Sequence, residues 1–327
     1  MITRSVPHWQ TELGQAIDRP AELLARLGLP ADLPVPARPA FTLRVPRAFV
    51  ERMVPRDLLD PLLRQVLPVA EEDQEVPGFS TDPVGDLAAL AAPGVLRKYR
   101  GRALLIVTGA CPIHCRYCFR RNFPYASTQA GRGRLAGAID HLAADPTIEE
   151  VILSGGDPLS LPDELLADAV ARIGAIPHVR RLRVHTRMPV VLPARVDDAL
   201  LGWLAETRLA TAFVLHANHP RELDEAVASA TRRLAGAGAA LLNQAVLLRG
   251  VNDDVATLSD LSARLFEVGV LPYYLHQLDR VQGAAHFEVE DVRARGLIAE
   301  LRARLPGYLV PRLVREERGT PCKTPLA

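Results

Sequence analysis

The feature that most limits the fold of this chain is a regular alternation of short β-rich runs and helix-length amphipathic segments, which begins near Tyr99. The β-rich runs predict six strands, over 103–107, 150–153, 182–185, 210–215, 240–247 and 272–276. The intervening segments predict helices over 131–144, 162–173, 196–205, 221–236, 255–267 and 289–304. Six βα units in succession predict an α/β fold with a parallel sheet and right-handed crossovers.

Polar or reactive residues recur where each predicted strand ends. They occupy 108–111, 154–157, 185–187, 216–219 and 276–279, and Asn243 and Gln244 lie inside the fifth strand. Barrel enzymes place their active sites at the face where the carboxyl ends of the strands meet. We therefore predict a partial (β/α)6, TIM-like barrel over 98–305, in preference to a doubly wound open sheet.

Two flanking regions complete the predicted organisation. Residues 1–97 read as a mainly helical region with many prolines, with helices expected over 12–27, 47–53 and 58–67 and a polar loop over 71–83. A lid, a partner-docking surface and a structural cap are all compatible with it. Residues 306–327 are expected to form a short C-terminal segment that closes the site.

Charge and hydrophobicity exclude several classes of partner. The net charge of +1 and the pI of 7.8 give no electrostatic footprint for nucleic acid. No run of about 18 apolar residues could span a membrane, and the N-terminus lacks an apolar signal core. We therefore expect a cytoplasmic protein.

Three of the four cysteines, Cys111, Cys115 and Cys118, follow the first predicted barrel strand with the spacing C-x3-C-x2-C. Such a cluster does not resemble a disulfide framework. Three thiolates are one too few for a closed zinc site or a fully ligated four-iron cluster. A four-iron cluster with one open iron is the preferred interpretation. The alternatives are zinc with His114 or Cys322 as fourth ligand, and buried cysteines that bind nothing.

Lysine is rare in this chain, because only Lys98 and Lys323 occur among 39 basic residues. An arginine cannot form a Schiff base and does not lose its proton in proteins. Each lysine therefore raises the question of whether an amine is required at its position, with ordinary surface use as the alternative.

These motifs together resemble the radical S-adenosylmethionine enzymes, in which C-x3-C-x2-C follows the first strand of a partial barrel. The resemblance implies a [4Fe-4S] cluster on the three cysteines, with S-adenosylmethionine chelated at the open iron and cleaved to a 5′-deoxyadenosyl radical. Its implied contacts with S-adenosylmethionine are Ser154, Gly155, Gly156, Asp157, His216 and Gln244.

The chain from about Tyr99 to Lys323 is more closely similar to the lysine 2,3-aminomutases. The landmarks are 115–121, 154–159, 187–193, 216–220, 243–248, 251–253, 273–279 and 307–311. In that family a lysine near the C-terminus binds pyridoxal 5′-phosphate, and the resemblance gives this role to Lys323. Tyr99 and Arg102 match a Tyr-x-x-Arg element that packs the pyridoxal ring and pairs with its phosphate. Lys98 is then expected to be ordinary.

The resemblance also implies residues for a lysine substrate. Arg120 matches the arginine that takes the substrate carboxylate, and Asp279 matches an aspartate that holds the ε-ammonium. The lysine mutases use a second aspartate seven residues before the pyridoxal lysine, where this chain has Glu316. A glutamate can still pair with an ammonium, although its carboxylate lies in a different position.

Three departures are similar to the subgroup that supplies (R)-β-lysine for elongation factor P. They are Glu316, a chain that ends four residues after Lys323, and the Pro/Gly-rich stretch 77–85. The implied reaction converts L-α-lysine to (R)-β-lysine, which a separate ligase attaches to elongation factor P. The implied partners are lysine, an electron donor protein, and a functional link to elongation factor P and its ligase.

Three rival functions stay open. A catabolic lysine, arginine or glutamate 2,3-aminomutase would share the cofactors and differ in substrate. A radical S-adenosylmethionine enzyme without pyridoxal phosphate would not need Lys323. A non-catalytic metal-binding scaffold would bind zinc and would not cleave S-adenosylmethionine.

Overall fold

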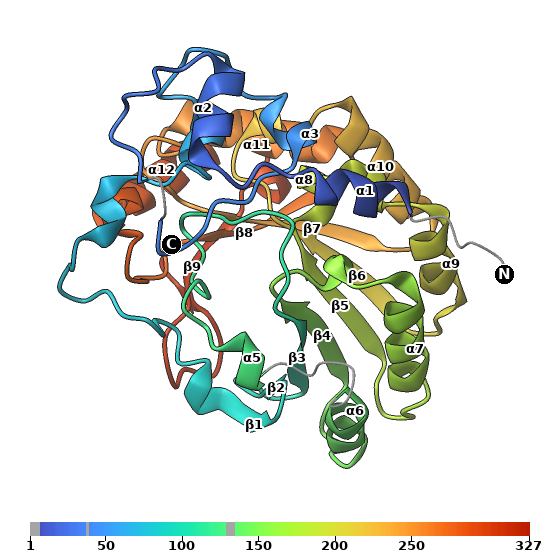
Figure 1. Ribbon diagram of the computed structural model, residues 1–327. Coiled ribbons are helices and arrows are strands. Elements are labelled where there is room, and N and C mark those ends of the chain that lie inside the picture. The colour runs from blue at the N-terminus through green and yellow to red at the C-terminus, as the bar shows by residue number, and fades with distance from the viewer. Residues whose placement is uncertain (1–6, 37–38, 129–134) are drawn as a thin grey trace, which may run out of the picture.

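The computed structural model describes residues 7–36, 39–128 and 135–327. The strands in these residues form one sheet whose spatial order follows the chain from β1 to β10 (Figure 1). Seven consecutive strands, β3 to β9, pair in parallel, and antiparallel strands extend the sheet at both edges. Helices cover the outer side of the curved sheet in Figure 1, which is the arrangement of an incomplete TIM-like barrel.

The six predicted βα units are confirmed. The strands are β3 (Arg102–Thr108), β4 (Glu150–Gly155), β5 (Arg181–Thr186), β6 (Ala210–Leu215), β7 (Ala240–Val246) and β8 (Leu271–His276). The helices between and after them are α6 (Leu135–Ala143), α7 (Asp163–Gly174), α9 (Asp198–Glu206), α10 (Glu225–Gly236), α11 (Val255–Glu267) and α12 (Asp291–Arg304). The first residues of the predicted helix over 131–144 lie outside the described residues.

Aspartate side chains set the starts of three of these helices. Asp197, Asp224 and Asp254 accept hydrogen bonds from the backbone N–H groups of Leu200, Val227 and Thr257, at 2.9–3.0 Å. Such caps satisfy N–H groups that have no partner within the helix. The caps explain why α9 and α10 begin two to four residues later than predicted.

The N-terminal region is less helical than predicted. The expected helix over 12–27 is two helices, α1 (His8–Gly14) and α2 (Pro20–Leu27). Between them Ile17 pairs with Val45 in an antiparallel bridge, and Pro20 opens the second helix because it has no N–H to donate inside one. The helices expected over 47–53 and 58–67 are single turns, α3 (Arg47–Val50) and α4 (Pro61–Arg64).

Four short strands were not predicted, because two to four residues carry too little periodicity to be recognised. They are β1 (Leu90–Ala92), β2 (Val95–Leu96), β9 (Arg312–Arg315) and β10 (Thr324–Pro325). β9 pairs in parallel with β8, and β10 turns back to pair with β9. This return brings the chain around Lys323 to the mouth of the barrel.

The remaining helical turns are short. The α-helical ones are α5 (Tyr125–Thr128) and α8 (Met188–Val191). The 3-10 turns are η1 (Ala70–Asp73), η2 (Leu87–Ala89), η3 (Pro158–Ser160), η4 (Pro193–Arg195), η5 (Pro220–Glu222), η6 (Ala285–Phe287) and η7 (Gly307–Leu309). η1 overlaps the start of the stretch 71–83, which was expected to be a loop. No helix in the described part of the chain is long and apolar enough to cross a membrane.

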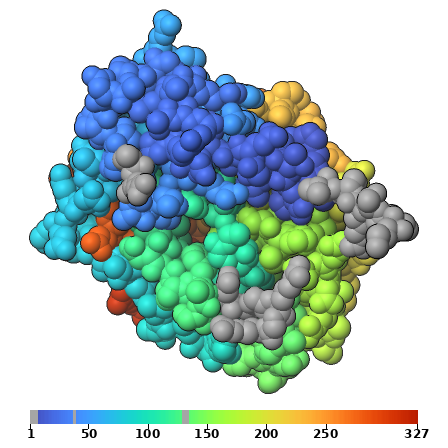
Figure 2. Space-filling view, viewed as in Figure 1, coloured from blue at the N-terminus to red at the C-terminus, as the bar shows by residue number. Residues whose placement is uncertain are grey.

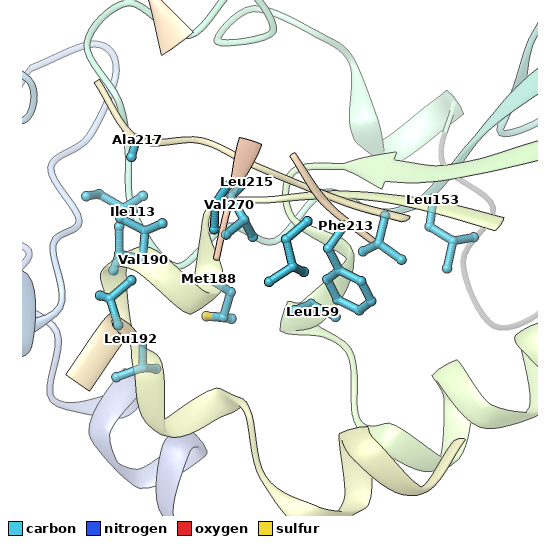
Figure 3. Close-up of a cluster of buried hydrophobic side chains, with 14 of the residues drawn as sticks. Ile113, Leu153, Leu159, Met188, Val190, Leu192, Phe213, Leu215, Ala217 and Val270 are labelled. Atoms are coloured by element: carbon cyan, nitrogen blue, oxygen red, sulfur yellow. The ribbon is translucent and has the colours of Figure 1, made fainter. Parts of the chain in front are cut away.

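The core lies between the sheet and the helices around it. Leu153, Phe213 and Leu215 project from β4 and β6 onto Leu159 and Met188, and all five side chains are completely buried (Figure 3). Figure 2 shows the N-terminal region, in blue, covering the upper part of the face viewed. Its Trp9, Phe49 and Leu62 belong to the same core cluster, so this region packs as part of the barrel body.

Two glycines hold the end of β4 against the loop that follows β3. Gly155 has φ +135°, and a Cβ there would lie 2.2 Å from the Thr108 carbonyl oxygen. A Cβ on Gly156 would lie 2.3 Å from the Ala110 carbonyl oxygen. The backbone N–H of Gly156 donates to the Thr108 oxygen at 2.8 Å. Both positions therefore require glycine for close packing against the cysteine loop.

We predict that Gly156→Ala lowers the free energy of unfolding by about 1–3 kcal/mol, because the added methyl group overpacks backbone that cannot move aside. Urea unfolding of the chain without cofactors measures this change. The matched control is Gly202→Ala in α9, where nothing lies within 4 Å of the new Cβ. There alanine raises helix stability by about 0.5–1 kcal/mol. Equal effects at the two sites would contradict the packing argument.

Candidate active site

A cavity of about 670 Å³ opens at the carboxyl ends of the barrel strands. This volume is typical of sites for small molecules and cofactors. Its lining includes every residue that the sequence analysis assigns to the site: Tyr99, Arg102, Cys111, Cys115, Cys118, Arg120, Ser154, Gly155, Gly156, Asp157, His216, Gln244, Asp279, Glu316 and Lys323. Residues up to 224 positions apart in the chain, from Tyr99 to Lys323, thus face one enclosed space.

The N-terminal region holds the cysteine loop from outside. The Arg116 side chain is fully buried, donates to Glu72 through Nε at 2.7 Å and donates to the Phe41 carbonyl oxygen at 2.9 Å. Arg121 donates to the same Glu72 carboxylate at 2.6 Å. The backbone N–H of Arg116 donates to the Gln65 carbonyl oxygen at 2.9 Å. Residues 41–72 therefore determine where the cysteines lie.

The three thiols suit a cluster better than a single ion. No three Cys, His, Asp or Glu side chains in the described ranges converge as they would on one metal ion. A cubane cluster places each thiolate on a different iron, so the thiols must surround a space instead of meeting at a point. Burial raises the pKa of Cys118 to about 11 and that of Cys111 well above its usual range. Binding to iron would supply the positive charge that favours the thiolates.

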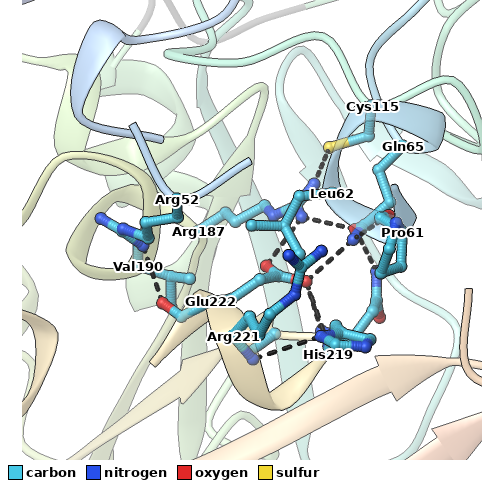
Figure 4. A network of polar contacts seen from close by, with 12 residues as sticks. Arg52, Pro61, Leu62, Gln65, Cys115, Arg187, Val190, His219, Arg221 and Glu222 are labelled. Atoms are coloured by element: carbon cyan, nitrogen blue, oxygen red, sulfur yellow. Dashed lines mark hydrogen bonds and ion pairs between the residues drawn. The ribbon is translucent and has the colours of Figure 1, made fainter. Parts of the chain in front are cut away.

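A buried polar network supports Cys115 (Figure 4). Arg187 donates a hydrogen bond to the Cys115 sulfur at 2.8 Å through one Nη. Its other Nη pairs with Glu222 at 2.9 Å and donates to the Gln65 side-chain oxygen at 2.7 Å. Glu222 is fully buried and also accepts the backbone N–H of Asn218 at 3.0 Å. A guanidinium beside a cluster ligand can stabilise negative charge on the sulfur.

The side chain of Asp157, just after β4, is engaged by hydrogen bonds within the protein. The Asp157 carboxylate accepts four hydrogen bonds, from Thr186 Oγ1 at 2.7 Å and from the backbone N–H groups of Leu159, Arg187 and Met188 at 2.8–3.1 Å. Burial raises the pKa of Asp157 to about 6, although these bonds oppose the rise. Any contact between Asp157 and a ligand would add to these four bonds.

Buried imidazoles line the middle of the cavity. Gln244 Nε2 lies 2.8 Å from His216 Nε2, and the His185 ring packs edge-on to the His216 ring. Burial lowers the pKa of His216 to about 3 and holds the pKa values of His185 and His276 well below the usual range. These imidazoles are therefore neutral at physiological pH. His185 and His276 each leave a buried Nε2 without a hydrogen-bond partner in the part of the chain that the structure describes. The sequence analysis did not select either as a site residue.

The residues assigned to pyridoxal phosphate fit that group. The Arg102 guanidinium lies 4.9 Å from the centre of the Tyr99 ring, and its buried Nε has no hydrogen-bond partner within residues 7–36, 39–128 and 135–327. A phosphate would satisfy this orphaned donor, and an aromatic face suits the pyridine ring. Lys323 Nζ lies 5.9 Å from the centre of the Tyr274 ring at the same end of the cavity. An aromatic wall, a cation and an amine thus meet in one place.

A chain of alternating charges runs through the cavity, and two of its members, Asp86 and Lys98, escaped the sequence analysis. Arg120 Nε pairs with Asp86 at 2.6 Å, and the other Asp86 oxygen lies 2.6 Å from Lys98 Nζ. Lys98 in turn lies 3.3 Å from Glu316, whose second oxygen contacts Lys323. The rarity of lysine was the one signal in the sequence that marked Lys98.

The charges in this chain keep both carboxylates ionised. Burial opposes ionisation of Asp86, but Arg120 and Lys98 together hold its pKa below the usual range. Burial likewise opposes ionisation of Glu316, and Lys323 and Lys98 hold its pKa below the usual range. The Arg120 Nη1 group donates to Ser154 Oγ at 3.0 Å, which connects the chain to the loop after β4.

Asp279 lies in the same cavity, but its carboxylate can still accept hydrogen bonds. Its Oδ1 is buried and has no hydrogen-bond partner among the described residues. Burial raises the pKa of Asp279 to about 7, and the neighbouring Lys323 opposes the rise. A buried carboxylate with a free oxygen is a site that favours a cationic ligand.

The segment 77–86 closes one side of the cavity. Ser80 pairs with Val281 just after Asp279, and the Val84 carbonyl oxygen accepts a hydrogen bond from Lys98 Nζ at 2.9 Å. A Cβ on Gly85 would meet the Arg318 side chain at 3.0 Å, so the segment packs against the turn before Lys323. This path places Asp86 inside the cavity.

Comparison with known proteins shows similarity over the whole chain. The Radical SAM superfamily profile matches residues 105–261. The L-lysine 2,3-aminomutase of Escherichia coli is 48% identical over 99% of this chain and 96% of its own length. The corresponding figures for that of Haemophilus influenzae are 46%, 99% and 96%. The L-lysine 2,3-aminomutase of Clostridium subterminale is 37% identical over 83% of this chain and 65% of its own length.

We predict that Glu222→Gln lowers the free energy of unfolding of the cofactor-free chain by about 3–5 kcal/mol, because it leaves the Arg187 guanidinium buried without its counter-charge. Glu225→Gln is the matched control. The Glu225 carboxylate pairs with Arg232 at the surface, where both side chains are more than half exposed. That change is expected to leave the free energy of unfolding nearly unchanged, because water screens the exposed pair. Similar losses in urea unfolding for the two variants would show that the buried pair has no special role.

Proposed function

Because the chain belongs to the lysine 2,3-aminomutase family of radical S-adenosylmethionine enzymes, we propose that it converts L-α-lysine to (R)-β-lysine. Family membership makes it an isomerase that depends on a [4Fe-4S] cluster, S-adenosylmethionine and pyridoxal phosphate. The observation that carries the choice of lysine is the free, buried Oδ1 of Asp279, in one cavity with Arg120 and Lys323. A substrate with a carboxylate at one end and an ammonium at the other matches these charges.

The proposed division of labour follows the walls of the cavity. Cys111, Cys115 and Cys118 would hold the cluster, while the loop after β4 with His216 and Gln244 would hold S-adenosylmethionine. Lys323, Tyr99 and Arg102 would hold pyridoxal phosphate. When bound, these groups supply the radical and carry the migrating nitrogen. The protein orients the substrate and excludes water from the enclosed space.

Arg120 would bind the substrate carboxylate. Its Nε is engaged by Asp86, and one N–H of its Nη1 is engaged by Ser154. Each Nη carries two N–H groups, so the outer edge of the guanidinium can still present two donors to a carboxylate. Asp86 and Ser154 would keep that edge in a fixed orientation.

We propose further that the product serves elongation factor P, to which a separate ligase would attach it. Supporting features are Glu316 in place of an aspartate and the segment 77–85, which packs against the turn before Lys323. An electron donor protein would reduce the cluster, and a cytoplasmic location would protect it from oxidation. Incubation of the reaction product with that ligase and elongation factor P tests this part, and a product that the ligase rejects would contradict it.

The proposed reaction is tested by anaerobic reconstitution with iron, sulfide and pyridoxal phosphate, followed by addition of S-adenosylmethionine, a reductant and isotope-labelled amino acids. We expect labelled lysine to yield β-lysine, and labelled arginine and glutamate to yield no β-amino acid. Lys323→Ala is expected to abolish the product, because the cofactor loses its amine. Absence of β-lysine together with turnover of arginine or glutamate would contradict the choice of substrate.

The pKa of Asp279 predicts a pH dependence for lysine binding. Above about pH 7 the Asp279 carboxylate is ionised and can pair with the ε-ammonium, and below this pH it becomes protonated. The dissociation constant for lysine should therefore rise about tenfold for each pH unit below 7. The charged groups around Asp279 are Lys323, Glu316, Lys98 and Asp86, and both other carboxylates stay ionised in this window.

Norleucine, which lacks the ε-amine, provides the control for this pH dependence because it shares the titrating α-amino group of lysine. Calorimetric titration of the cofactor-free protein, in which Lys323 keeps its ammonium group, should show the step below pH 7 for lysine and not for norleucine. Asp279→Asn should remove the step and weaken lysine binding at pH 8. Parallel pH profiles for the two amino acids would contradict the role of Asp279.

A further inference from the structure

We propose that Lys98 is a specificity-determining residue that keeps Glu316 paired, so that Asp279 is the one carboxylate left to receive the ε-ammonium of the substrate. This inference rests on the proposed function, because it concerns how a lysine substrate is recognised. It replaces the expectation that Lys98 is an ordinary residue. In this proposal Glu316 pairs with the lysine side chains of the protein and not with the substrate.

The Lys98 ammonium group lies close to three oxygen atoms of the protein. Three oxygen atoms lie within 3.3 Å of its Nζ: the Val84 carbonyl oxygen at 2.9 Å, Asp86 Oδ1 at 2.6 Å and Glu316 Oε1 at 3.3 Å. A lysine ammonium has three N–H groups and no acceptor. Its side chain is 20% exposed, and those of Asp86 and Glu316 are 2% and 11% exposed, so water has little access to these pairs.

The two lysines of the chain meet at a single carboxylate. Glu316 contacts Lys98 through Oε1 and Lys323 through Oε2. When Lys323 is bonded to pyridoxal phosphate, its amine no longer serves Glu316 as a free ammonium. Without another cation, a carboxylate this deeply buried would then lose its counter-charge, which is strongly unfavourable. Lys98 supplies a second cation, which stays beside Glu316 whether or not Lys323 is bonded to pyridoxal phosphate.

The chemistry of the side chain explains why this position holds a lysine in a chain that otherwise uses arginine. An ammonium concentrates its charge and three donors on one nitrogen, which can approach two carboxylates and a carbonyl oxygen at once. A guanidinium spreads its donors over a planar fork and needs more space. The 39 basic residues include only two lysines, and both contact Glu316.

The pairing limits how the cavity can bind a substrate cation. With Lys98 present, Glu316 already has a cation and attracts the ε-ammonium weakly. Asp279 has a free, buried oxygen and is not saturated. Removal of the Lys98 charge would leave two unpaired carboxylates at one end of the cavity. A free lysine would then bind more tightly, because its ε-ammonium would neutralise a second buried charge.

The test compares lysine and norleucine binding to pyridoxal-loaded wild type, Lys98→Met and Lys98→Arg by calorimetry at pH 8. In Lys98→Met the affinity for lysine should increase about tenfold, the scale of one added charge-assisted hydrogen bond. The affinity for norleucine should change less than twofold. Lys98→Arg keeps the charge but presents its donors on a planar fork, so its affinity for lysine should lie closer to that of wild type than to that of Lys98→Met. Arg232→Met is the matched control, because it removes a cation that is exposed at the surface. This variant should behave as wild type.

An unchanged or weakened preference for lysine in a folded Lys98→Met protein would overturn the role of Lys98. Should Lys98→Met fail to fold, Lys98→Gln removes the charge while keeping hydrogen-bond donors, and the same increase is expected. Failure of the proposed function looks different, because wild type itself would then show no preference for lysine over norleucine. That outcome would overturn both proposals.

Discussion

Buried charges are costly unless they are paired, and this constraint shapes the cavity. The row Arg120, Asp86, Lys98, Glu316, Lys323 alternates in sign from the loop after β4 to the last strand. Each carboxylate in the row has two cationic neighbours, so one cation can engage a ligand without leaving a carboxylate unpaired. Asp279 lies outside the row, and its free oxygen marks where an additional cation fits.

The fold brings this row together from segments that are distant in sequence. Parallel strands deliver the cysteine loop, the glycine-rich turn and Asp279 to one face. The N-terminal region supplies Glu72 and Gln65 behind the cysteines, and the segment 77–86 supplies Asp86. β10 returns the chain so that Lys323 reaches Glu316. The region before the barrel therefore contributes side chains that hold and line the site.

The barrel could be predicted because strand and helix periodicity extends over many residues. The cysteine loop, the turn after β4 and Asp279 could be placed at one face because each follows a strand, whereas Tyr99, Arg102 and Lys323 took their expected roles from the family resemblance. Asp86 and Lys98 could not be assigned, since their importance lies in contacts that the sequence does not show: Asp86 with Arg120 and Lys98, and Lys98 with Glu316, 218 positions away. Asp157 shows the opposite case, in which a residue of a recognised motif has contacts that the motif does not reveal. Its motif indicates a ligand contact, whereas its hydrogen bonds join β4 to the start of α8. The short edge strands form because their neighbours pair with them.

The two lysines of the chain have different tasks beside the Glu316 carboxylate, and one measurement distinguishes these tasks directly. Borohydride reduction of the pyridoxal-loaded protein fixes the cofactor covalently to the amine that carries it, and peptide mass spectrometry identifies that residue. The account predicts the pyridoxyl group on Lys323 alone, with Lys98 unmodified. A pyridoxyl group on Lys98, or on neither lysine, would contradict it.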